Sequence, residues 1–597
     1  MDSKPLSIRM CFLLILFFGI AAYSNTFNSP FHFDDIPSIL EHRRLHPLNL
    51  GQLWNYMPPR FISYLSLALN IYISGFETWS FHILNLLIHI LSAWVVFRLT
   101  LLILATPSIK DLVLPSQQNL FALAPALLFL THPLQTQAVT YIVQRMASLA
   151  TLFYLATLLM YLKARLEEAR NYRLVFLFML AAMLCKQISF TLPFAILLMD
   201  FYFFPLSEKE TVRVKILRWL PYAAFLLILL APYWITTYKN LIHTGELKGI
   251  LPSSQTTLSR WDYLLTEFRV LRTYLRLLVL PIGQCLFYDY RLSTGRGDPD
   301  TWVAFTLLLS LFSLAIALSK KNRLLSFGIL WFFLTLSVES TIVPLDDVIF
   351  EHRLYLPMFG FALALTSLLW RVTRSPKIFA AVLLSLVVIL SGMTYFRNEV
   401  WKTKLALSWD IAKKCPNKGV SYAGLGDAYS REAKDDRTAV IYYEKALALG
   451  YVNPFGYYNL YACYGRLGDQ KKSSHYDKLF RGFAGPVKDF ASNYDHALAM
   501  ISEGKDTEAI EAFKKAIRVD PSYPMAHIRL GETYLKMQRE QEAIFSFKKA
   551  IEVSPLDKAG YDALALFYKA KGEDQKALAV MVDYVKCQKR HKPLFGG

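Results

Sequence analysis

Two adjacent carboxylates, Asp34 and Asp35, directly follow the first apolar segment of the chain, in the sequence Phe-His-Phe-Asp-Asp over residues 31–35. Carboxylates are unfavourable near hydrocarbon, so a pair beside a membrane indicates a functional site. A structural interpretation is equally compatible with this stretch taken alone. Asp35 precedes Ile36 and Pro37, an arrangement typical of a helix N-cap. Residues elsewhere in the chain must distinguish the two interpretations.

Several charged residues and histidines are not explained by the charge pattern of cytoplasmic loops. They are Arg60, His82, His132, Arg145, Lys186 and the triplet Glu351-His352-Arg353. One acidic pair with several cations suits a reaction whose leaving group is a phosphate. The cations would stabilise the departing anion, and a carboxylate would take the proton from the attacking hydroxyl. We therefore expect Asp34 and Asp35 in catalysis and the others in substrate or phosphate binding.

His82 also belongs to a polar stripe on an apolar helix, because His82, Asn85 and His89 are spaced i, i+3 and i+7. Hydrogen bonding between helices is a common reason for such a stripe in membrane bundles. We favour this structural role for His89. For His82, which lies nearer the outer end, the structural and functional interpretations remain open.

The composition indicates a polytopic membrane protein. The chain has 597 residues, of which 54% are hydrophobic, and its mean hydropathy is positive. The net charge of +19 resides mostly in short basic clusters between apolar runs, at 163–173, 209–218, 320–323 and 371–377. This is the positive-inside pattern of cytoplasmic loops, and it argues against nucleic acid as the partner.

We predict eleven membrane spans with the N-terminus in the cytoplasm. Their ranges are 8–24, 81–104, 119–131, 146–163, 172–185, 188–205, 216–236, 300–318, 323–340, 355–372 and 376–394. The leucine-rich segment 263–281 carries Arg269, Arg272 and Arg276, so we place it at the interface or as a re-entrant segment. This choice puts all four basic clusters in the cytoplasm and the candidate site residues on the opposite face.

The first apolar run and the cysteines each allow a second interpretation. The first apolar run, 11–22, resembles a secretory signal peptide, but we interpret it as a retained first span because many spans follow. The six cysteines show no C-x-x-C spacing, so neither a zinc site nor a redox pair is indicated. A disulfide among Cys415, Cys463 and Cys587 is compatible with the sequence but has no support in it.

From about residue 420 the chain becomes charged, rich in alanine and repetitive. The clearest unit contains Leu530-Gly531, Tyr534, Ala543, Phe547, Ala550 and Pro555, which is the tetratricopeptide spacing with a period near 34 residues. We expect about five repeats, sufficient to share a continuous core and to present a concave surface to an extended peptide or protein.

The polar motifs together resemble a known family over nearly the whole chain. They are Asp34-Asp35; Arg60-Phe61, Leu65-Ser66 and Leu69-Asn70; Gly75, His82, Asn85 and His89; His132-Pro133, Thr136, Ala138-Val139 and Arg145; Lys186 with Leu192-Pro193; and residues 351–357, Glu-His-Arg-Leu-Tyr-Leu-Pro. The pattern resembles the transmembrane and tetratricopeptide-repeat O-mannosyltransferases and their bacterial relatives, in the GT-C superfamily. The resemblance implies an inverting transfer from a polyprenyl-phosphate sugar with Asp34 as the catalytic base.

The sequence departs from the family pattern at two positions. Gln137 and Gln187 stand where eukaryotic members usually carry glutamate, which affects any metal, any second acid, the donor sugar and the carrier. The sequence indicates no cofactor, and it leaves open whether a divalent metal ion is bound. The short repeat array and the lack of a terminal retention signal favour a bacterial inner-membrane protein with periplasmic repeats over one of the endoplasmic reticulum.

The sequence therefore predicts a mainly α-helical protein with three parts: a GT-C-like membrane bundle over 1–396, a linker helix over 397–419 and an α-solenoid of tetratricopeptide repeats over 420–590. Its expected partners are membrane lipid, a polyprenyl-phosphate sugar and a protein or peptide acceptor. The alternative is an inactive scaffold that assembles an envelope complex through its repeats, and the two glutamines are the feature in its favour.

Overall fold

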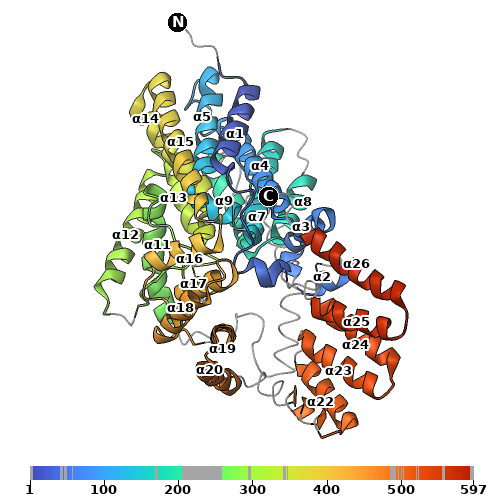
Figure 1. Cartoon of the computed structure of the whole chain (residues 1–597). Helices are drawn as coiled ribbons and strands as arrows, with labels where there is room; N and C mark the ends of the chain where they lie inside the picture. The colour runs from blue at the N-terminus through green and yellow to red at the C-terminus, as the bar shows by residue number, and fades with distance from the viewer. Residues whose placement is uncertain are drawn as a thin grey trace, which may run out of the picture. The chain divides into compact units, whose positions relative to one another are not determined.

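The structure is a computed structural model of the whole chain. It describes residues 5–591 except 41–44, 46–49, 57, 168–171, 205–258, 294–296, 341–344, 346, 453, 484–492, 495, 499, 502, 520, 522 and 554–557. The described chain is mainly helical, as predicted, and it divides into two compact units (Figure 1). The first is Met1–Ser74 with Thr78–Pro416, and the second is Gly75–Glu77 with Asn417–Gly597.

Ten of the eleven predicted spans coincide with helices of the first unit. These helices are α1 (Ile8–Tyr23), α4 (Thr78–Leu104), α5 (Gln118–Thr131), α7 (Arg145–Leu166), α8 (Arg173–Met183), α9 (Leu192–Phe203), α12 (Pro299–Leu318), α13 (Arg323–Leu336), α14 (Pro357–Thr373) and α15 (Pro376–Glu399). The predicted span 216–236 lies outside the described residues. Two further helices, α2 (Leu50–Tyr56) and α3 (Phe61–Ser74), lie in the loop after the acidic pair.

Four of the described helical segments are long and apolar enough to cross a membrane. They are Thr78–Leu104, Ile142–Leu166, Pro299–Leu318 and Pro376–Glu399. Five other apolar helices are shorter, with 10–17 residues, so the number eleven stays a prediction. α12 and α15 leave large apolar side chains exposed, among them Val303, Ile316 and Val388, as expected of a surface that faces lipid.

The packing of α13 against α14 depends on two glycines. A Cβ atom at Gly328 would lie 2.3 Å from the Gly360 carbonyl oxygen, and one at Gly360 would lie 2.4 Å from the Trp331 ring. Any larger residue would force the two backbones apart. This use of small residues lets helices in apolar surroundings gain van der Waals contact and is typical of membrane bundles.

The arginine-rich segment forms α11 (Arg260–Val279), which is not among the helices apolar enough to span. Two of its arginines are paired with carboxylates at the start of α12. Arg269 lies 3.1 Å from Asp298, and Arg272 holds Asp300 at 2.6 Å. Each pair offsets the cost of burying an arginine, which explains how α11 packs beside the apolar α12.

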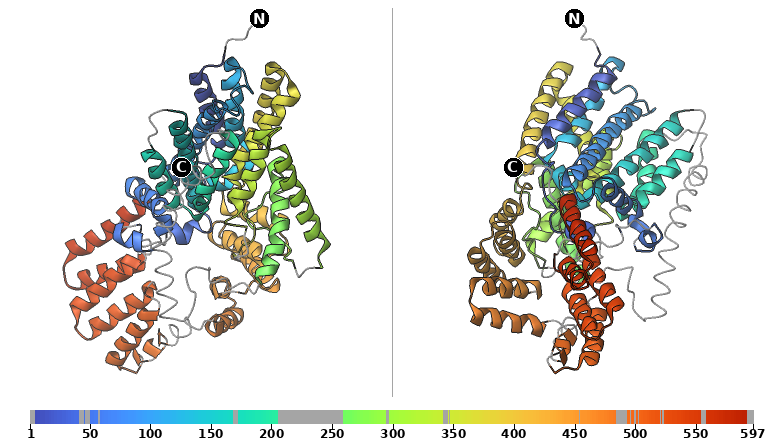
Figure 2. Two further views of the ribbon diagram at one scale, coloured as in Figure 1. Left: turned by 180° about the vertical axis from the view of Figure 1, so that it is seen from behind. Right: turned by 45° about the vertical axis from the view of Figure 1, so that its right-hand side comes forward.

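The second unit consists of antiparallel helix pairs. In the two views of Figure 2 they are coloured from yellow-brown to red along the chain. Its described helices are α17 (Gly419–Arg431), α18 (Asp436–Ala448), α19 (Pro454–Leu467), α20 (Gln470–Phe483), α22 (Asp506–Val519), α23 (Pro524–Lys536), α24 (Glu540–Val553), α25 (Lys558–Ala570) and α26 (Asp574–His591). The linker helix α16 (Lys404–Lys414) belongs to the first unit.

The repeat period is visible in the backbone as well as in the sequence. Five described turns that join the two helices of a pair contain a residue with positive φ, and these residues are Lys434, Gly468, Gly504, Gln538 and Gly572. They follow one another at intervals of 34, 36, 34 and 34 residues, because each turn between paired helices needs one left-handed residue. The repeated glycine also recurs: a Cβ at Gly426 or Gly531 would strike the ring of Tyr443 or Phe547.

Candidate active site

The two carboxylates of the acidic pair lie in different environments. Asp35 is fully buried; one of its oxygens accepts from the backbone N–H of Val143 at 2.7 Å and the other from that of His32 at 2.9 Å. Neither oxygen caps the turn that follows, so Asp35 ties two loops together instead. Asp34 is exposed, and its backbone N–H donates to the Tyr141 hydroxyl at 2.7 Å.

The loop that presents Asp34 is strained. Phe33 has φ of 35°, a conformation that costs a side-chain-bearing residue about 1–3 kcal/mol and clusters at functional sites. Its ring packs edge-on against Phe287, and the preceding His32 packs edge-on against Trp401. These contacts and the Asp35 anchor hold the strained turn, so that Asp34 is the member of the pair that a substrate can reach.

Burial shifts the pKa of all three titratable groups in this loop. It raises the pKa of Asp35 to about 8, although the two backbone amides oppose the shift. Asp34 has an exposed side chain, but the surrounding protein still removes part of the water around its carboxylate and raises its pKa, opposed by a hydrogen bond from Tyr141. Burial lowers the pKa of His32 to about 4, so this histidine is neutral and its Nε2 donates to the Trp401 carbonyl at 2.8 Å. Asp34 is therefore a stronger base than an ordinary aspartate.

Arg145 lies at the centre of what we call the arginine hub, formed with Ser66, Asn70, Phe81 and Asn85. Its guanidinium donates to Asn85 Oδ1 (2.6 Å), Asn70 Oδ1 (2.9 Å) and the carbonyls of Phe81 (3.1 Å) and Ser66 (3.2 Å). The residue is fully buried. The hub joins α3, α4 and the start of α7, and the protein itself uses the donors that a phosphate would need.

Three histidines that the sequence singled out also form hydrogen bonds within the protein. His82 Nε2 bonds to the Ser29 carbonyl (2.9 Å), His89 Nε2 to the Leu130 carbonyl (2.9 Å) and His132 Nε2 to the Leu278 carbonyl (3.1 Å). All three are buried. These bonds join elements distant in sequence, as expected for hydrogen bonding between helices, and favour positioning roles over contact with a ligand.

The remaining cations form a second group, the cation cluster of Arg60, Lys186, His352 and Arg353. Lys186 and Arg353 are 7% exposed and His352 8%. Burial and the nearby charges of Lys186, Arg353 and Arg60 together hold the pKa of His352 well below its usual value. The structure thus brings together cations from three loops that are far apart in the sequence.

Two carboxylates border the cation cluster. Glu339 lies 2.8 Å from Lys186. Burial raises the pKa of Glu267 to about 7, although Arg353 opposes the shift. Arg60 Nε is buried without a hydrogen-bond partner among the described residues. Arg60, Lys186 and Arg353 are three basic side chains beside two carboxylates, of which Glu339 is ion-paired with Lys186 and Glu267 has a raised pKa. The described groups therefore carry an excess of positive charge suited to an anion.

Glu351 precedes His352 and Arg353 in the sequence, but its carboxylate bonds to a different loop. Its carboxylate accepts from the Tyr288 hydroxyl (2.7 Å), the Cys285 backbone N–H (2.7 Å) and the Gln284 amide (2.9 Å). Arg353 in turn donates to the carbonyls of Val348 and Asp347, both at 2.8 Å. Glu351 therefore fixes the short helix η7 (Glu351–Leu354) that carries His352 and Arg353.

One short segment connects the cation cluster with the acidic pair. Gln137 accepts from the His352 backbone N–H at 2.6 Å. Tyr141, four residues later, accepts from Asp34. The helix α6 (Thr136–Val139) and the following turn thus contact both groups within the first unit. Gln137 is one of the two positions at which the sequence departs from the family pattern, and its amide oxygen has a structural role.

The sequence analysis missed Tyr141, Glu267, Glu339 and Trp401. Glu339 offered a signal, since it is the one carboxylate in the apolar segment 323–340. Tyr141 and Trp401 offered none, because aromatic residues are common throughout the chain. Within the described part of the chain, no group of three or more His, Cys, Asp and Glu side chains is placed to hold a metal ion.

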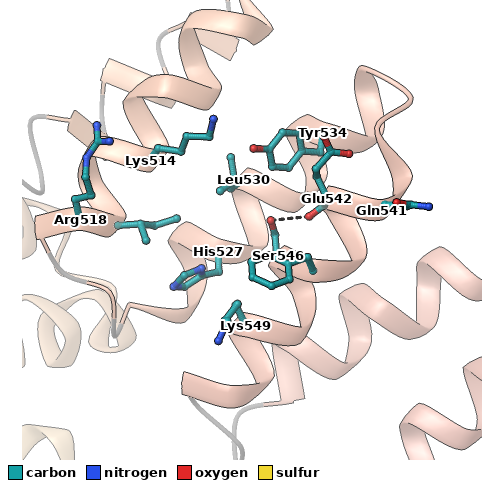
Figure 3. Close-up of a pocket in the computed structure, with 11 residues that line it drawn as sticks. Lys514, Arg518, His527, Leu530, Tyr534, Gln541, Glu542, Ser546 and Lys549 are labelled. Atoms are coloured by element: carbon teal, nitrogen blue, oxygen red, sulfur yellow. Dashed lines mark hydrogen bonds between the residues drawn. The ribbon is translucent and has the colours of Figure 1, made fainter.

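The repeats contain a separate groove of about 660 Å³ between α22, α23 and α24 (Figure 3). Lys514 and Arg518 project from α22 on one side, and Glu542, Ser546 and Lys549 from α24 on the other. Lys514 and Lys549 are each paired at the surface with a glutamate of their own helix, at 2.8 and 2.6 Å. The groove therefore offers a mixed polar and aliphatic surface of the size that a peptide segment requires.

The fold and the candidate site define a class: an apolar helical unit, with buried cations and an exposed carboxylate, followed by tetratricopeptide repeats. Comparison with known proteins agrees with this class. The family models described as "TPR repeat" and "Tetratricopeptide repeat" match residues 497–538 and 526–555. The repeats are thereby confirmed.

The resemblance to the O-mannosyltransferases extends over most of the chain. The human "Protein O-mannosyl-transferase TMTC3" is 22% identical over 87% of this chain and 61% of its own length. "Protein O-mannosyl-transferase Tmtc3" of Drosophila melanogaster is 24% identical over 75% and 56%, and the human TMTC4 protein is 24% identical over 71% and 64%. The chain thus spans about 60% of the length of these relatives. A solved structure, "Crystal structure of MamA", covers 28% of this chain and 96% of its own at 23% identity, with a TM-score of 0.19.

Proposed function

We propose that this chain is an integral-membrane glycosyltransferase that moves a sugar from a polyprenyl-phosphate donor to a hydroxyl group of a protein. The observation that carries the proposal is the attachment of two chemically different groups to one short segment. Residues 137–141 contact both the loop of the exposed base Asp34 and the cation cluster. The names of the relatives, O-mannosyl-transferases, support the same reaction class.

In the proposed reaction the acceptor hydroxyl attacks the anomeric carbon while Asp34 takes its proton. A new C–O bond forms, and the bond from the anomeric carbon to the phosphate oxygen breaks with its electron pair on the phosphate. Arg60, Lys186 and Arg353 stabilise the departing polyprenyl phosphate. Asp35, with both oxygens bound to backbone amides, positions the loop of Asp34 and does not contact substrate.

The remaining predicted residues act as positioning residues in this proposal. Arg145, His82 and His132 hold helices and loops through buried hydrogen bonds. Glu351 orients the helix that carries His352 and Arg353. The proposal thus keeps Asp34 as the catalytic residue and reserves phosphate binding for the cation cluster.

The proposal includes a GT-C fold of eleven spans with a cytoplasmic N-terminus and the repeats on the opposite side. In a bacterium this places the site in the periplasm, and in a eukaryote on the lumenal face of the endoplasmic reticulum. The positive-inside distribution of the basic clusters supports this orientation. The repeats would recruit the protein acceptor, and the groove between α22 and α24 is one surface suited to a peptide.

The test is release of polyprenyl phosphate by purified full-length protein supplied with polyprenyl-phosphate mannose and a protein acceptor. Asp34→Asn should lower the rate by about 100-fold or more, the usual contribution of a general base, without loss of folded protein. Asp111→Asn, at another exposed carboxylate, is the matched control and should keep the wild-type rate. Undiminished release by Asp34→Asn would overturn the role of the base.

A second candidate function is an inactive scaffold that uses its repeats to assemble an envelope complex. The observation in its favour is that Gln137 and Gln187 replace expected carboxylates. The same assay distinguishes the two: a scaffold releases no polyprenyl phosphate as wild type, whereas the transferase does. A series of other lipid-linked sugars then separates a change of donor from loss of activity.

A further inference from the structure

Two buried cysteines far apart in the sequence lie side by side in the first unit. Cys285 is in the loop between α11 and α12, and Cys415 directly follows the linker helix α16. Their sulfur atoms are 3.4 Å apart, and the two residues are 1% and 3% exposed. Both thiols donate to the same acceptor, the Phe287 carbonyl, at 3.0 and 2.7 Å.

Hydrogen bonds on both sides of the pair fix the two segments against each other. Lys414, the neighbour of Cys415, donates to the carbonyl of Gln284, the neighbour of Cys285, at 2.6 Å. The backbone N–H of Asp289 donates to Cys415 Sγ at 3.3 Å. The sulfurs therefore face each other within a fixed backbone frame and would need to approach by about 1.4 Å to reach bonding distance.

We propose that Cys285 and Cys415 form a disulfide that fastens the linker helix to the loop that holds Glu351. The two thiols lose two protons and two electrons as the S–S bond forms. A protein disulfide of an oxidoreductase in the extracytoplasmic compartment accepts the electrons and is reduced to a dithiol. The inference rests on the proposed function in one respect, the extracytoplasmic position of this loop.

Burial and the neighbouring thiol both raise the pKa of Cys285. The folded pair therefore contains little of the thiolate that reacts in disulfide exchange. The bond forms during folding, before α16 covers the loop, and it is then protected from reduction. Cys11, Cys185 and Cys463 are also buried, but each has no second cysteine beside it in the described part of the chain.

The consequence for the site follows from the partners of Glu351. Gln284 and the backbone of Cys285 donate two of the three hydrogen bonds that Glu351 accepts. A bond at Cys285 therefore fixes the loop that orients η7, and with it His352 and Arg353. The same bond secures the segment through which the repeats join the membrane unit.

The experiment counts disulfide-bonded cysteines in the full-length protein in its native membrane. Membranes are denatured in N-ethylmaleimide to block free thiols, then reduced and treated with a polyethylene-glycol maleimide that adds a visible mass to each released thiol. Two additions are expected for wild type and for the control Cys463→Ser. None is expected for Cys285→Ser or Cys415→Ser. No addition in wild type, or additions that persist in Cys285→Ser, would overturn the proposal.

The labelling result and the transfer assay are independent. Asp34→Asn should lose transfer and keep both additions, since Asp34 lies outside this contact. If transfer depends on Asp34 while wild type shows no addition, the disulfide alone is wrong. If two additions are found while no donor is turned over, the proposed function alone is wrong. Because labelling follows denaturation, a variant that folds poorly still gives a clear count.

Discussion

The arginine hub and the cation cluster are both buried groups of positive charge in the first unit, but their hydrogen bonds differ. Arg145 makes four hydrogen bonds to protein acceptors, two of them to asparagine side chains. In the cation cluster, Arg60 Nε has no partner among the described residues, and burial together with neighbouring charges of the same sign lowers the pKa of His352.

This difference in hydrogen bonding indicates that Arg145 supports the fold, whereas the cation cluster is available to a ligand. A buried charge requires compensation, either from the protein or from what the protein binds. The hub is compensated by protein dipoles, so its loss should destabilise the fold. The cation cluster is compensated only in part, so its loss should weaken binding of an anion. Two variants test this contrast, and a third tests the base beside the cation cluster; they follow in order of decreasing effect.

The hub should be sensitive to Arg145→Lys. Lysine keeps the charge but cannot reproduce the planar fork, so several buried acceptors lose their donor. We expect a loss of about 3 kcal/mol or more in stability, seen as a lower melting temperature and less folded full-length protein in detergent. Arg98→Lys, an exposed arginine of α4, is the control. A variant as stable as wild type but inactive would place Arg145 with the cation cluster.

The cation cluster should respond in the opposite way to Arg60→Gln. This residue is half-buried, and its Nε has no hydrogen-bond partner among the described residues, so its removal breaks no described hydrogen bond of that atom. We expect transfer to fall about 10- to 100-fold, the scale for one charge-stabilising donor, with little change in melting temperature. Arg291→Gln, an exposed arginine in another loop of this unit, should behave as wild type. A large fall in melting temperature would assign Arg60 to the fold.

The sequence predicted the helices and the repeats well because their signals are periodic. Apolar runs located ten described helices of the first unit to within a few residues. The 34-residue period recurs as positive-φ turns, including Lys434 and Gln538, where no glycine reveals the turn in the sequence. Periodic signals average over many residues, so a single departure does not hide them.

The roles of single polar residues could not be predicted in the same way. Arg145 and Lys186 are indistinguishable as cations at the ends of apolar segments, and only their partners separate them. The partner of Lys186, Glu339, is about 150 residues away in sequence, and the acceptors of Arg145 lie on two other helices. Asp35 illustrates the same limit, because both of its partners are backbone amides, which any sequence supplies.

The smallest predicted effect concerns Tyr141, in the segment that connects the cation cluster with the acidic pair. Asp34 acts as a base only when ionised, so the transfer rate should fall as pH falls through its pKa, which burial raises above the usual aspartate value. The Tyr141 hydroxyl stabilises the ionised form. Tyr141→Phe removes this stabilisation, so Asp34 should need a higher pH to ionise.

The measurement is the pH profile of kcat/KM for the full-length protein, which reports the base in the free enzyme. The acid limb of Tyr141→Phe should lie at higher pH than that of wild type, with similar rates on the alkaline plateau. Tyr395→Phe, a tyrosine at the partly exposed end of α15, should leave the limb in place. A uniform loss of rate at every pH would instead mean that Tyr141 only shapes the loop, as Gln137 does through its bond to His352. A displaced limb would show that the segment between the acidic pair and the cation cluster also adjusts the base.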